Sequence, residues 1–296
     1  MAYLTDRRAE VRNDPRALLP SARSIICVGK LYNGPQPYST EFRNSELAWI
    51  SRYAWGDDYH DVLRSGLERL AGRLLEIAPF EYKICVDTAP LLERSYARAA
   101  GLGWIGKNTC LINQQSGSWF FLGELLTSLD LEPDSPPPDR CGTCTRCIDA
   151  CPTAAIVPDG PGYTLDSRLC ISYFTIELRT AISPGQRSKI SNHVFGCDIC
   201  QDVCPWNRRS PVSSAFEARH LAPPLEKLAA LSEQDFRDLF RSSPVRRAKY
   251  AGFLRNVAVA MGNARSEKFR EPLQKLAQSP EPLIAEHARW ALDQLN

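Results

Sequence analysis

Long apolar stretches are missing from this 296-residue sequence. No run approaches the roughly 18 consecutive apolar residues that a membrane-spanning helix needs. The first residues, MAYLTDRRAEVRND, also lack the apolar segment of a secretory signal. The sequence therefore predicts a soluble, cytoplasmic protein with no membrane partner.

A large net charge is also missing. The 36 basic residues are balanced by 34 acidic ones, which leaves a net charge of +2. The total does not identify a nucleic-acid-binding protein, so such a function must rest on a local cluster of basic residues. Residues 236–256 form such a cluster, with Asp238 as the one acid. Its basic residues are Arg237, Arg241, Arg246, Arg247, Lys249 and Arg255.

Cysteine, by contrast, is abundant, with 11 residues. Disulfides are rare in the cytoplasm, so clustered cysteines there more often bind metal or carry out redox chemistry. Eight of the 11 lie between Cys141 and Cys204. We expect the other three, Cys27, Cys85 and Cys110, to be small buried core residues, because each has apolar neighbours.

The first cysteine run has the spacing of a bacterial ferredoxin. It reads CGTCTRCIDACP, from Cys141 to Pro152, and matches the C-x2-C-x2-C-x3-C-P pattern in full. In proteins with two 4Fe–4S clusters, the fourth cysteine of such a run binds the other cluster. Structural zinc is the alternative, since CxxC pairs also bind zinc, but zinc ligands usually come in pairs. The run therefore predicts iron–sulfur clusters.

A second run, CDICQDVCPW, starts at Cys197 and lacks only the first cysteine of the pattern. Cys170 is the nearby cysteine that can take this place. Two neighbouring clusters with crossed ligands then form a relay for single electrons. The predicted ligands of the first cluster are Cys141, Cys144, Cys147 and Cys204. The predicted ligands of the second cluster are Cys170, Cys197, Cys200 and Cys151.

Strands and helices alternate before the cysteine-rich region. This alternation predicts an α/β unit over residues 1–130. Predicted strands cover residues 24–32, 82–86, 109–113 and 118–126, the last two as a hairpin around QQSG. Predicted helices cover residues 57–77 and 91–100, the second ending at Gly101.

The remaining chain divides at a proline-rich segment. DLEPDSPPPDR, residues 130–140, predicts an extended linker. Beyond the cysteines the pattern is helical, and Ser232 with Asp235 forms a capping-box pattern. Amphipathic stretches over residues 252–261 and 281–295 predict either paired helices of a HEAT-type repeat or an ordinary helical hairpin.

Five longer segments complete the pattern. They are VDTAPLLERSYARAAGLGWIGKNTCLI at residues 86–112, GSWFFLGELLTSLDL at 117–131, SYFTIELR at 172–179, GCDICQDVCPWN at 196–207 and YAGFLRNVAVAMGN at 250–263. In this order, over essentially the whole chain, they resemble the epoxyqueuosine reductase family. The resemblance implies a cobalamin-dependent enzyme, related to reductive dehalogenases. Such an enzyme reduces the epoxide of epoxyqueuosine, at the wobble position of tRNA anticodons, to an alkene.

The resemblance also implies an architecture and partners. We expect an α/β cobalamin-binding and catalytic domain over residues 1–130, a ferredoxin-like two-cluster domain over 131–210, and a helical HEAT-like tRNA-binding region over 211–296. The expected partners are a tRNA with a GUN-type anticodon and an unidentified low-potential electron donor, and the expected state is a monomer. The first residues, MAYL, resemble a region some way inside usual family members, so we expect the first elements of the family to be absent.

Asp87 is the candidate acid. It follows the predicted strand 82–86, at the end where α/β proteins place ligand sites. Opening an epoxide requires a proton on its oxygen, and burial among apolar residues favours a protonated carboxyl group. The resemblance makes Asp87 this proton donor. A helix cap is the alternative, because Asp87 precedes Thr-Ala-Pro.

A glycine-rich segment, GLGWIGKN at residues 101–108, looks like a dinucleotide-binding motif. It follows a helix and precedes a strand, which is the reverse of a Rossmann turn. It either lets a flat corrin approach the backbone or forms a tight turn. Cobalamin proteins that bind cobalt through a histidine often carry a D-x-H-x-x-G motif, and the stretch around His60 lacks its glycine. We therefore expect His60 to lie on the surface of a helix and the cobalt ion to have no histidine ligand. Expected cobalamin contacts are Asp87, Gly103, Gly106, Lys107, Leu111, Asp198 and Ile199.

The basic cluster is the candidate tRNA surface, although charged runs on helices are often only solvated faces. Tyr250 and Phe253 either stack on bases or belong to the core. Two other functions compete: a cobalamin-dependent reductase of a small organohalide, which has no use for a basic helical tail, and a ferredoxin-type electron carrier, which needs no α/β domain. The expected tRNA contacts are Arg246, Arg247, Lys249, Arg255 and Asn256.

Overall fold

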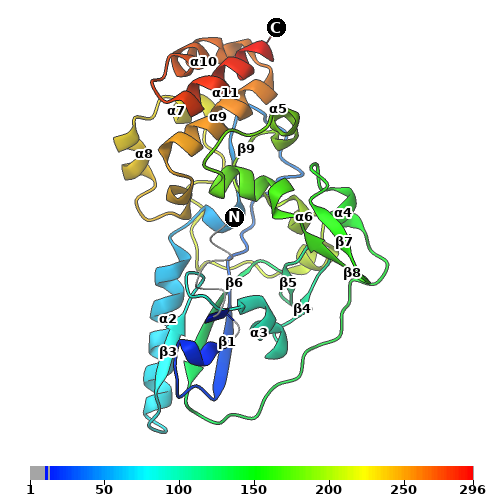
Figure 1. Cartoon of the computed structure of the whole chain (residues 1–296), viewed down its shortest axis with the longest axis vertical. Helices are drawn as coiled ribbons and strands as arrows, with labels where there is room; N and C mark the ends of the chain where they lie inside the picture. Colours follow the sequence, from blue (N-terminus) through cyan, green and yellow to red (C-terminus); the bar gives the residue numbers. More distant parts are fainter. Residues whose placement is uncertain (1–10, 13, 296) are drawn as a thin grey trace. The chain divides into compact units, whose positions relative to one another are not determined.

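The computed structural model describes residues 11, 12 and 14–295. The MAYL segment, and with it the expectation of absent first elements, lies outside these residues. The chain forms two compact units, each assembled from separate stretches of sequence (Figure 1). Within the described residues, none of the helices has both the length and the apolar character needed to cross a membrane. Unit 1 comprises Met1–Asn33, Asp58–Cys144 and Pro205–Ala215, and unit 2 comprises Gly34–Asp57, Thr145–Cys204 and Phe216–Asn296.

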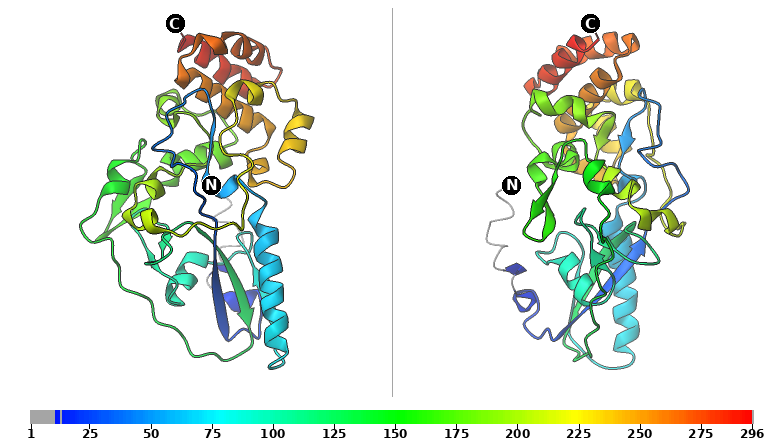
Figure 2. Two further views of the ribbon diagram at one scale, coloured as in Figure 1. Left: turned by 180° about the vertical axis from the view of Figure 1, so that it is seen from behind. Right: turned by 90° about the vertical axis from the view of Figure 1, so that its right-hand side faces the viewer.

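Unit 1 is built on a three-stranded sheet in the order β1-β6-β3. The central strand, β6 (Phe120–Thr127), runs antiparallel to both β1 (Ser24–Leu31) and β3 (Tyr82–Cys85). The long helix α2 (Tyr59–Leu75) lies along one face of the sheet (Figure 2). These elements confirm the strands and the helix predicted over residues 24–32, 57–77 and 82–86. However, neither β1 nor β3 is the buried strand that the apolar patterns predict, because both are edge strands: β1 has no buried residue, and the first two residues of β3 are exposed.

The hairpin predicted around QQSG is wrong in its pairing. Asn113 and Gly117 form one isolated bridge, but β5 (Leu111–Ile112) pairs with β4 (Trp104–Ile105) instead of β6. Both edges of β6 are already used by β1 and β3, so β5 has no free edge to join. The short helix α3 (Glu93–Ala99) confirms its prediction, and Gly101 follows it with a φ of +77°, as expected for a C-terminal cap.

Unit 2 contains six of the eight clustered cysteines. Residues 130–140, which lead toward it, have no regular secondary structure, as the prolines predict. The cysteine-rich part includes a π-helical turn over Tyr173–Glu177. Its other elements are α4 (Arg146–Asp149), the hairpin of β7 (Ile156–Asp159) and β8 (Gly162–Leu165), α5 (Pro184–Arg187), β9 (His193–Phe195) and α6 (Ile199–Asp202), and β9 pairs in parallel with β2 (Trp49–Ile50).

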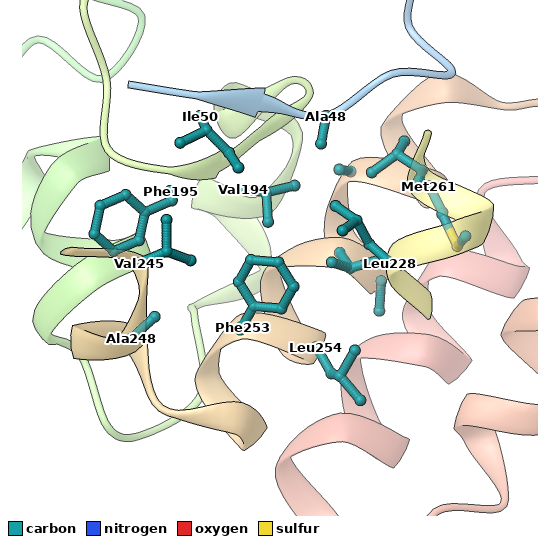
Figure 3. Close-up of a cluster of buried hydrophobic side chains, with 14 of the residues drawn as sticks. Ala48, Ile50, Val194, Phe195, Leu228, Val245, Ala248, Phe253, Leu254 and Met261 are labelled. Carbon is teal, nitrogen blue, oxygen red and sulfur yellow. The ribbon is translucent and has the colours of Figure 1, made fainter. Parts of the chain in front are cut away.

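The C-terminal helices enclose the main core of unit 2. Helix α9 is buried from Gly252 to Gly262, and Phe253 and Leu254 lie in a cluster with Ile50 and Val194 (Figure 3). A helix that is apolar on all sides is stable only when its neighbours cover it. Its bounds and those of the other helices are α7 (Leu225–Ala229), α8 (Glu233–Leu239), α9 (Tyr250–Ala264), α10 (Arg270–Ala277) and α11 (Pro282–Asp293).

The predicted helix pair and capping box are confirmed. Ser232 and Asp235 exchange hydrogen bonds at the start of α8. Helices α9 and α11 pack against each other, and Gly262 allows their close approach. A Cβ atom at Gly262 would lie 2.8 Å from both Cα and Cβ of Ala291. Since real Cβ atoms do not approach a backbone atom so closely, any larger residue must push the helices apart.

The substitution Gly262→Ala should lower the free energy of unfolding by about 1–3 kcal/mol, because the added methyl group overpacks the contact with α11. Gly252→Ala in the same helix is the matched control, since its Cβ would meet only Arg255 Nη2 at 3.9 Å. Urea unfolding followed by circular dichroism measures both variants. Equal stability of the two would contradict the close contact.

Candidate functional site

Three thiols predicted for the second cluster, those of Cys151, Cys170 and Cys197, belong to unit 2 and interact electrostatically. Burial raises the pKa of Cys197, and the nearby thiols of Cys170 and Cys151 raise it further. Burial likewise raises the pKa of Cys170, with a contribution from Cys151. These mutual effects link segments that are far apart in sequence. None of the 11 cysteines, all of which the structure describes, forms a disulfide bond.

Backbone N–H groups point at these sulfurs. Ala155 donates to Cys151 Sγ at 3.3 Å, and backbone hydrogen bonds from Ser172 and Tyr173 lower the pKa of Cys170 against the effect of burial. Iron binds the thiolate form, and hydrogen bonds to the sulfurs stabilise its negative charge and tune the cluster potential. These hydrogen bonds suit thiolate ligands, and the ligand set of the second cluster stays a prediction.

The ligands predicted for the first cluster are divided between the units. Cys141 and Cys144 belong to unit 1, whereas Cys147 and Cys204 belong to unit 2, so this cluster stays a prediction. In unit 1, the Lys107 ammonium donates to the carbonyl oxygens of Gly142 at 2.7 Å and Cys144 at 3.0 Å. Lys107 therefore binds the backbone of the first cysteine loop. The sequence predicts a cobalamin contact for Lys107 but not this structural role.

Asp87 lies in unit 1, directly after β3. Its φ is +46°, and its backbone N–H donates to Glu93 Oε1 at 2.5 Å. The helix-cap alternative is wrong, because α3 begins at Glu93 with Leu92 as its N-cap residue. The expected burial is wrong too, since the Asp87 side chain is 38% exposed. Burial among apolar residues therefore cannot be what keeps a proton on this carboxyl group.

His60 supplies the neighbour that sequence reasoning missed. It lies in the first turn of α2, with Nδ1 2.6 Å from Asp58 Oδ1 and Nε2 3.4 Å from Asp87 Oδ2. The hydrogen bond to Asp58 raises the pKa of His60 to about 9, with Asp87 as the next contribution. At neutral pH, His60 is therefore an imidazolium beside the carboxyl groups of Asp58 and Asp87, and not a plain surface residue. The His60 imidazolium therefore holds a proton next to the Asp87 carboxyl group.

Two further carboxyl groups lie behind Asp87. Burial is the main cause that raises the pKa of Glu93 to about 7, and the charge of Asp87 adds to it. Glu124, on the central strand β6, is fully buried. Burial, then the charges of Glu93 and Asp87, raise its pKa to about 9. The lone acid in the apolar strand FFLGELLT was the sequence signal for this group.

The thiols on either side of Glu124 behave as predicted core residues. Cys27 on β1 and Cys85 on β3 both pair with Glu124 across the sheet. Burial raises the pKa of Cys27 to about 12 and that of Cys85 to about 11. Both thiols therefore stay protonated. Cys85 is buried, whereas Cys27 and Cys110 are half-buried.

The glycines predicted to admit a corrin are explained by the β4–β5 hairpin itself. A Cβ atom at Gly103 would lie 2.3 Å from the carbonyl oxygen of Ile112, and one at Gly106 would lie 2.5 Å from Ile112 Cδ1. Leu111 is buried in the same hairpin. The tight-turn alternative therefore accounts for both glycines, and the rejection of a Rossmann turn is confirmed because the segment links α3 to β5.

The Asp198 side chain does not face a cofactor, so its predicted cobalamin contact is wrong. The alternative, a solvated loop residue, is also wrong, because Asp198 is buried. Asp198 is 1% exposed. One oxygen accepts from the Arg52 backbone N–H at 2.7 Å and from Trp49 Nε1 at 3.2 Å, and the other accepts from the Ser51 hydroxyl group. These bonds attach the second cysteine loop to β2 and leave no oxygen for a cofactor. Ile199 is half-buried at the start of α6, and its contact stays a prediction.

The cobalamin contacts predicted from the sequence are divided between the units: Asp198 and Ile199 belong to unit 2 and the other five to unit 1. In unit 1, a groove of about 1020 Å³ opens along β1, with Tyr96 of α3 on its wall. None of the predicted contacts lines this groove. The cobalamin contacts as a set therefore stay a prediction.

Arg255 and Asn256 do not lie on a tRNA surface, because both are fully buried. The Arg255 guanidinium donates to the carbonyl oxygens of Phe174, Leu178 and Thr180 at 2.5, 2.8 and 2.8 Å. Burial, then the charge of Arg179, lowers the pKa of Arg255 to about 10. The sequence prediction is wrong here: the charge of Arg255 predicts an exposed side chain, whereas its guanidinium satisfies backbone acceptors at and just beyond the π-helical turn.

The rest of the basic cluster is exposed. Arg246, Arg247 and Lys249 lie on the surface around a short turn before α9. Arg247 Nε pairs with Glu177 at 2.5 Å. Tyr250 and Phe253 follow the core alternative, since Phe253 is fully buried and the Tyr250 hydroxyl group donates to the Leu231 carbonyl at 2.9 Å.

We expect Arg255→Met to destabilise the protein by about 2–5 kcal/mol, because it leaves buried carbonyl groups without donors. Urea unfolding measures this effect. Lys249→Gln is the control, since an exposed substitution should change stability by less than about 0.5 kcal/mol. If Arg255→Met unfolded like the wild type and only weakened tRNA binding, the scaffolding role of Arg255 would be wrong.

Glu124→Gln should alter how stability depends on pH. The folded-state pKa of Glu124, about 9, lies above the ordinary value of 4.5. Protonation of this group therefore favours the folded state, and its contribution is lost as the pH rises from about 5 to about 9. Thermal unfolding across this range should show a smaller alkaline loss for Glu124→Gln than for the wild type. The exposed Glu68→Gln should follow the wild type, and parallel curves for all three proteins would refute the prediction.

Comparison with known proteins identifies relatives over nearly the whole chain. A family model described as "4Fe-4S double cluster binding domain" matches residues 140–207, and one described as "Epoxyqueuosine reductase QueG, DUF1730" matches residues 12–88. The epoxyqueuosine reductase of Xanthomonas campestris is 42% identical over 97% of this chain and 82% of its own length. The Pseudomonas aeruginosa enzyme of that name is 44% identical over 95% of this chain and 79% of its own length.

Solved structures agree with these relatives. An epoxyqueuosine reductase crystallised with an epoxyqueuosine-modified tRNA-Tyr stem loop superposes with a TM-score of 0.88 at 33% identity, over 97% of this chain and 77% of that one. The Bacillus subtilis epoxyqueuosine reductase, described with an aspartate catalytic loop swung out of the active site, gives a TM-score of 0.87 at 31% identity over the same shares. With a double-cluster domain, an N-terminal family match and relatives above 40% identity along its length, the chain belongs to the epoxyqueuosine reductase family.

Proposed function

We propose that this chain reduces the epoxide of epoxyqueuosine in tRNA to the alkene of queuosine, with electrons delivered one at a time by two 4Fe–4S clusters. The observation that carries the proposal is the likeness to an epoxyqueuosine reductase crystallised with its modified tRNA stem loop, over 97% of this chain. The double-cluster match over residues 140–207 and the electrostatic coupling of the thiols of Cys151, Cys170 and Cys197 support the electron relay.

The proton donor of ring opening is Asp87, acting with His60. The carboxyl group of Asp87 is accessible, and the His60 imidazolium lies 3.4 Å from it. When Asp87 gives its proton to the epoxide oxygen, His60 can replace that proton without a change of position. The Bacillus subtilis relative, in which an aspartate lies on a catalytic loop, is consistent with this role.

Cobalamin is the proposed acceptor of the electrons. Each cluster passes single electrons, whereas reduction of an epoxide to an alkene takes two, so a group must collect them. The family resemblance names cobalamin for this purpose.

The proposed substrate is a tRNA with a GUN-type anticodon, modified at the wobble position. Its unpaired loop bases can be turned outward into a pocket. Arg246, Arg247 and Lys249 are the proposed phosphate contacts, because they are exposed on the same turn. We further propose a cytoplasmic monomer, an unidentified low-potential electron donor, and the three-domain division at residues 130 and 210.

Replacing Asp87 by Asn should lower the rate of conversion at least about 100-fold, because the amide cannot give a proton to the oxygen. The assay is anaerobic reconstitution with iron, sulfide and cobalamin, followed by turnover of epoxyqueuosine-containing tRNA and mass spectrometry of the nucleosides. Asp61→Asn, on the exposed first turn of α2, is the control.

Two outcomes of this assay would contradict the proposals. Near-normal conversion by Asp87→Asn would remove the acid role of Asp87. Failure of the wild type to convert the tRNA, with both clusters bound, would instead favour a small organohalide substrate or a plain electron carrier.

A further inference from the structure

We propose that Glu93 and Glu124 form a proton store behind Asp87 that supplies the second of the two protons consumed in the reaction. This inference rests on the proposed function and deepens it, because it assigns a source to each proton. Glu93 and Glu124 act through Asp87 and are proton-supplying residues, not groups that touch the substrate.

The stoichiometry of the reaction sets the requirement. An epoxide, two electrons and two protons give an alkene and one water molecule. Both C–O bonds break, a C=C bond forms, and the oxygen leaves with both protons. The clusters of the proposed function supply the electrons. The Asp87–His60 pair accounts for the first proton, and a second must reach the same oxygen before water can leave.

The contact between Glu93 and Asp87 provides the connection. Glu93 Oε1 accepts the Asp87 backbone N–H at 2.5 Å, although the two residues belong to different elements. The positive φ of Asp87 gives its N–H this direction at the end of β3. The hydrogen bond from the Asp87 N–H lowers the pKa of Glu93, but burial and then the charge of Asp87 raise it by more, so Glu93 retains a proton that an exposed carboxylate would lose.

Glu124 extends this store into the sheet. It is fully buried on β6, and neither of its carboxyl oxygens has a hydrogen-bond partner among the described residues. A bare carboxylate at such a position is very costly, so the group is kept neutral and holds a proton. The raised pKa values of Glu93 and Glu124 agree with this protonation.

Within the described part of the chain, no cation contributes to the pKa shift of Glu124. Its cross-strand neighbours are the protonated thiols of Cys27 and Cys85, and the charges that act on it are those of Glu93 and Asp87. Around Glu93, Arg94 and His60 oppose the effects of burial and of Asp87 only in part. The charged groups that act on this store are therefore Asp87, His60, Glu93, Arg94 and Glu124.

The pH dependence of single turnover tests the store. The variants are Glu93→Gln and Glu124→Gln, with the exposed Glu68→Gln as the matched control. Both store variants should react at close to the wild-type rate at pH 6, where solvent protons are plentiful, and about tenfold more slowly than the wild type at pH 7, where wild-type Glu124 is protonated and wild-type Glu93 is about half protonated. A variant that is only damaged in its fold would lose a similar factor at every pH, and that uniform loss would overturn the proposal.

Infrared spectroscopy provides a second measurement that needs no turnover. The wild type at pH 7 should show the carbonyl stretch of a protonated, buried carboxyl group, which Glu124→Gln removes and Glu68→Gln keeps. A wild-type spectrum without this band would overturn the store whatever the activity. If the wild type shows the band but does not convert epoxyqueuosine, the proposed function is contradicted. The protonated carboxyl group then exists, but it does not supply a proton to this reaction.

Discussion

Unit 2 depends on a buried cation that binds backbone oxygens. Arg255 donates to three carbonyl groups at and just beyond the π-helical turn that follows Cys170. The adjacent Asn256 donates to Thr175 in the same turn and to Val194 in β9, three residues before Cys197. A π-helical turn leaves acceptors that regular helices would satisfy, and these two side chains supply the donors. Two cysteine-bearing segments are thereby held to one helix.

In unit 1, the corresponding constraint is electrostatic. Asp87 lies between an imidazolium on α2 and a carboxyl group on α3, and a further carboxyl group is buried in the sheet. Each of these groups changes the proton affinity of the next, so the set titrates as a unit. The fold places several protons within reach of one accessible oxygen atom, which suits a reaction that consumes protons together with electrons.

Local patterns made much of this fold predictable. The periodic leucines of α2, the apolar run of β1, Gly101 after α3 and the capping box at Ser232 all follow from interactions within a few residues. The cysteine spacing likewise encodes its own chemistry. The predictions that were wrong concern residues with partners distant in sequence. Both edges of β6 pair with other strands, which excludes the predicted hairpin, and His60 contacts Asp87, which lies 27 residues further along the chain.

The same limit explains the errors at charged residues. Arg255 and Asp198 are polar residue types that are usually exposed, yet both are buried because each satisfies several backbone or side-chain groups at once. Residue type alone predicts a surface position. Only the tertiary structure shows which unpaired acceptors or donors need them.

The division of the chain into interleaved stretches has a consequence for biosynthesis. The path changes unit after Asn33, Asp57, Cys144, Cys204 and Ala215. The sequence of unit 1 is complete once the ribosome has passed Ala215, whereas unit 2 is complete only after the C-terminal helices are synthesised. Strand β2 is synthesised early but cannot pair until β9 has been made. Contacts between such distant segments form slowly. The thiols of unit 2 are therefore all synthesised before the helix that positions two of their segments, which leaves a nascent chain whose metal ligands are accessible to delivery factors and to oxidants alike.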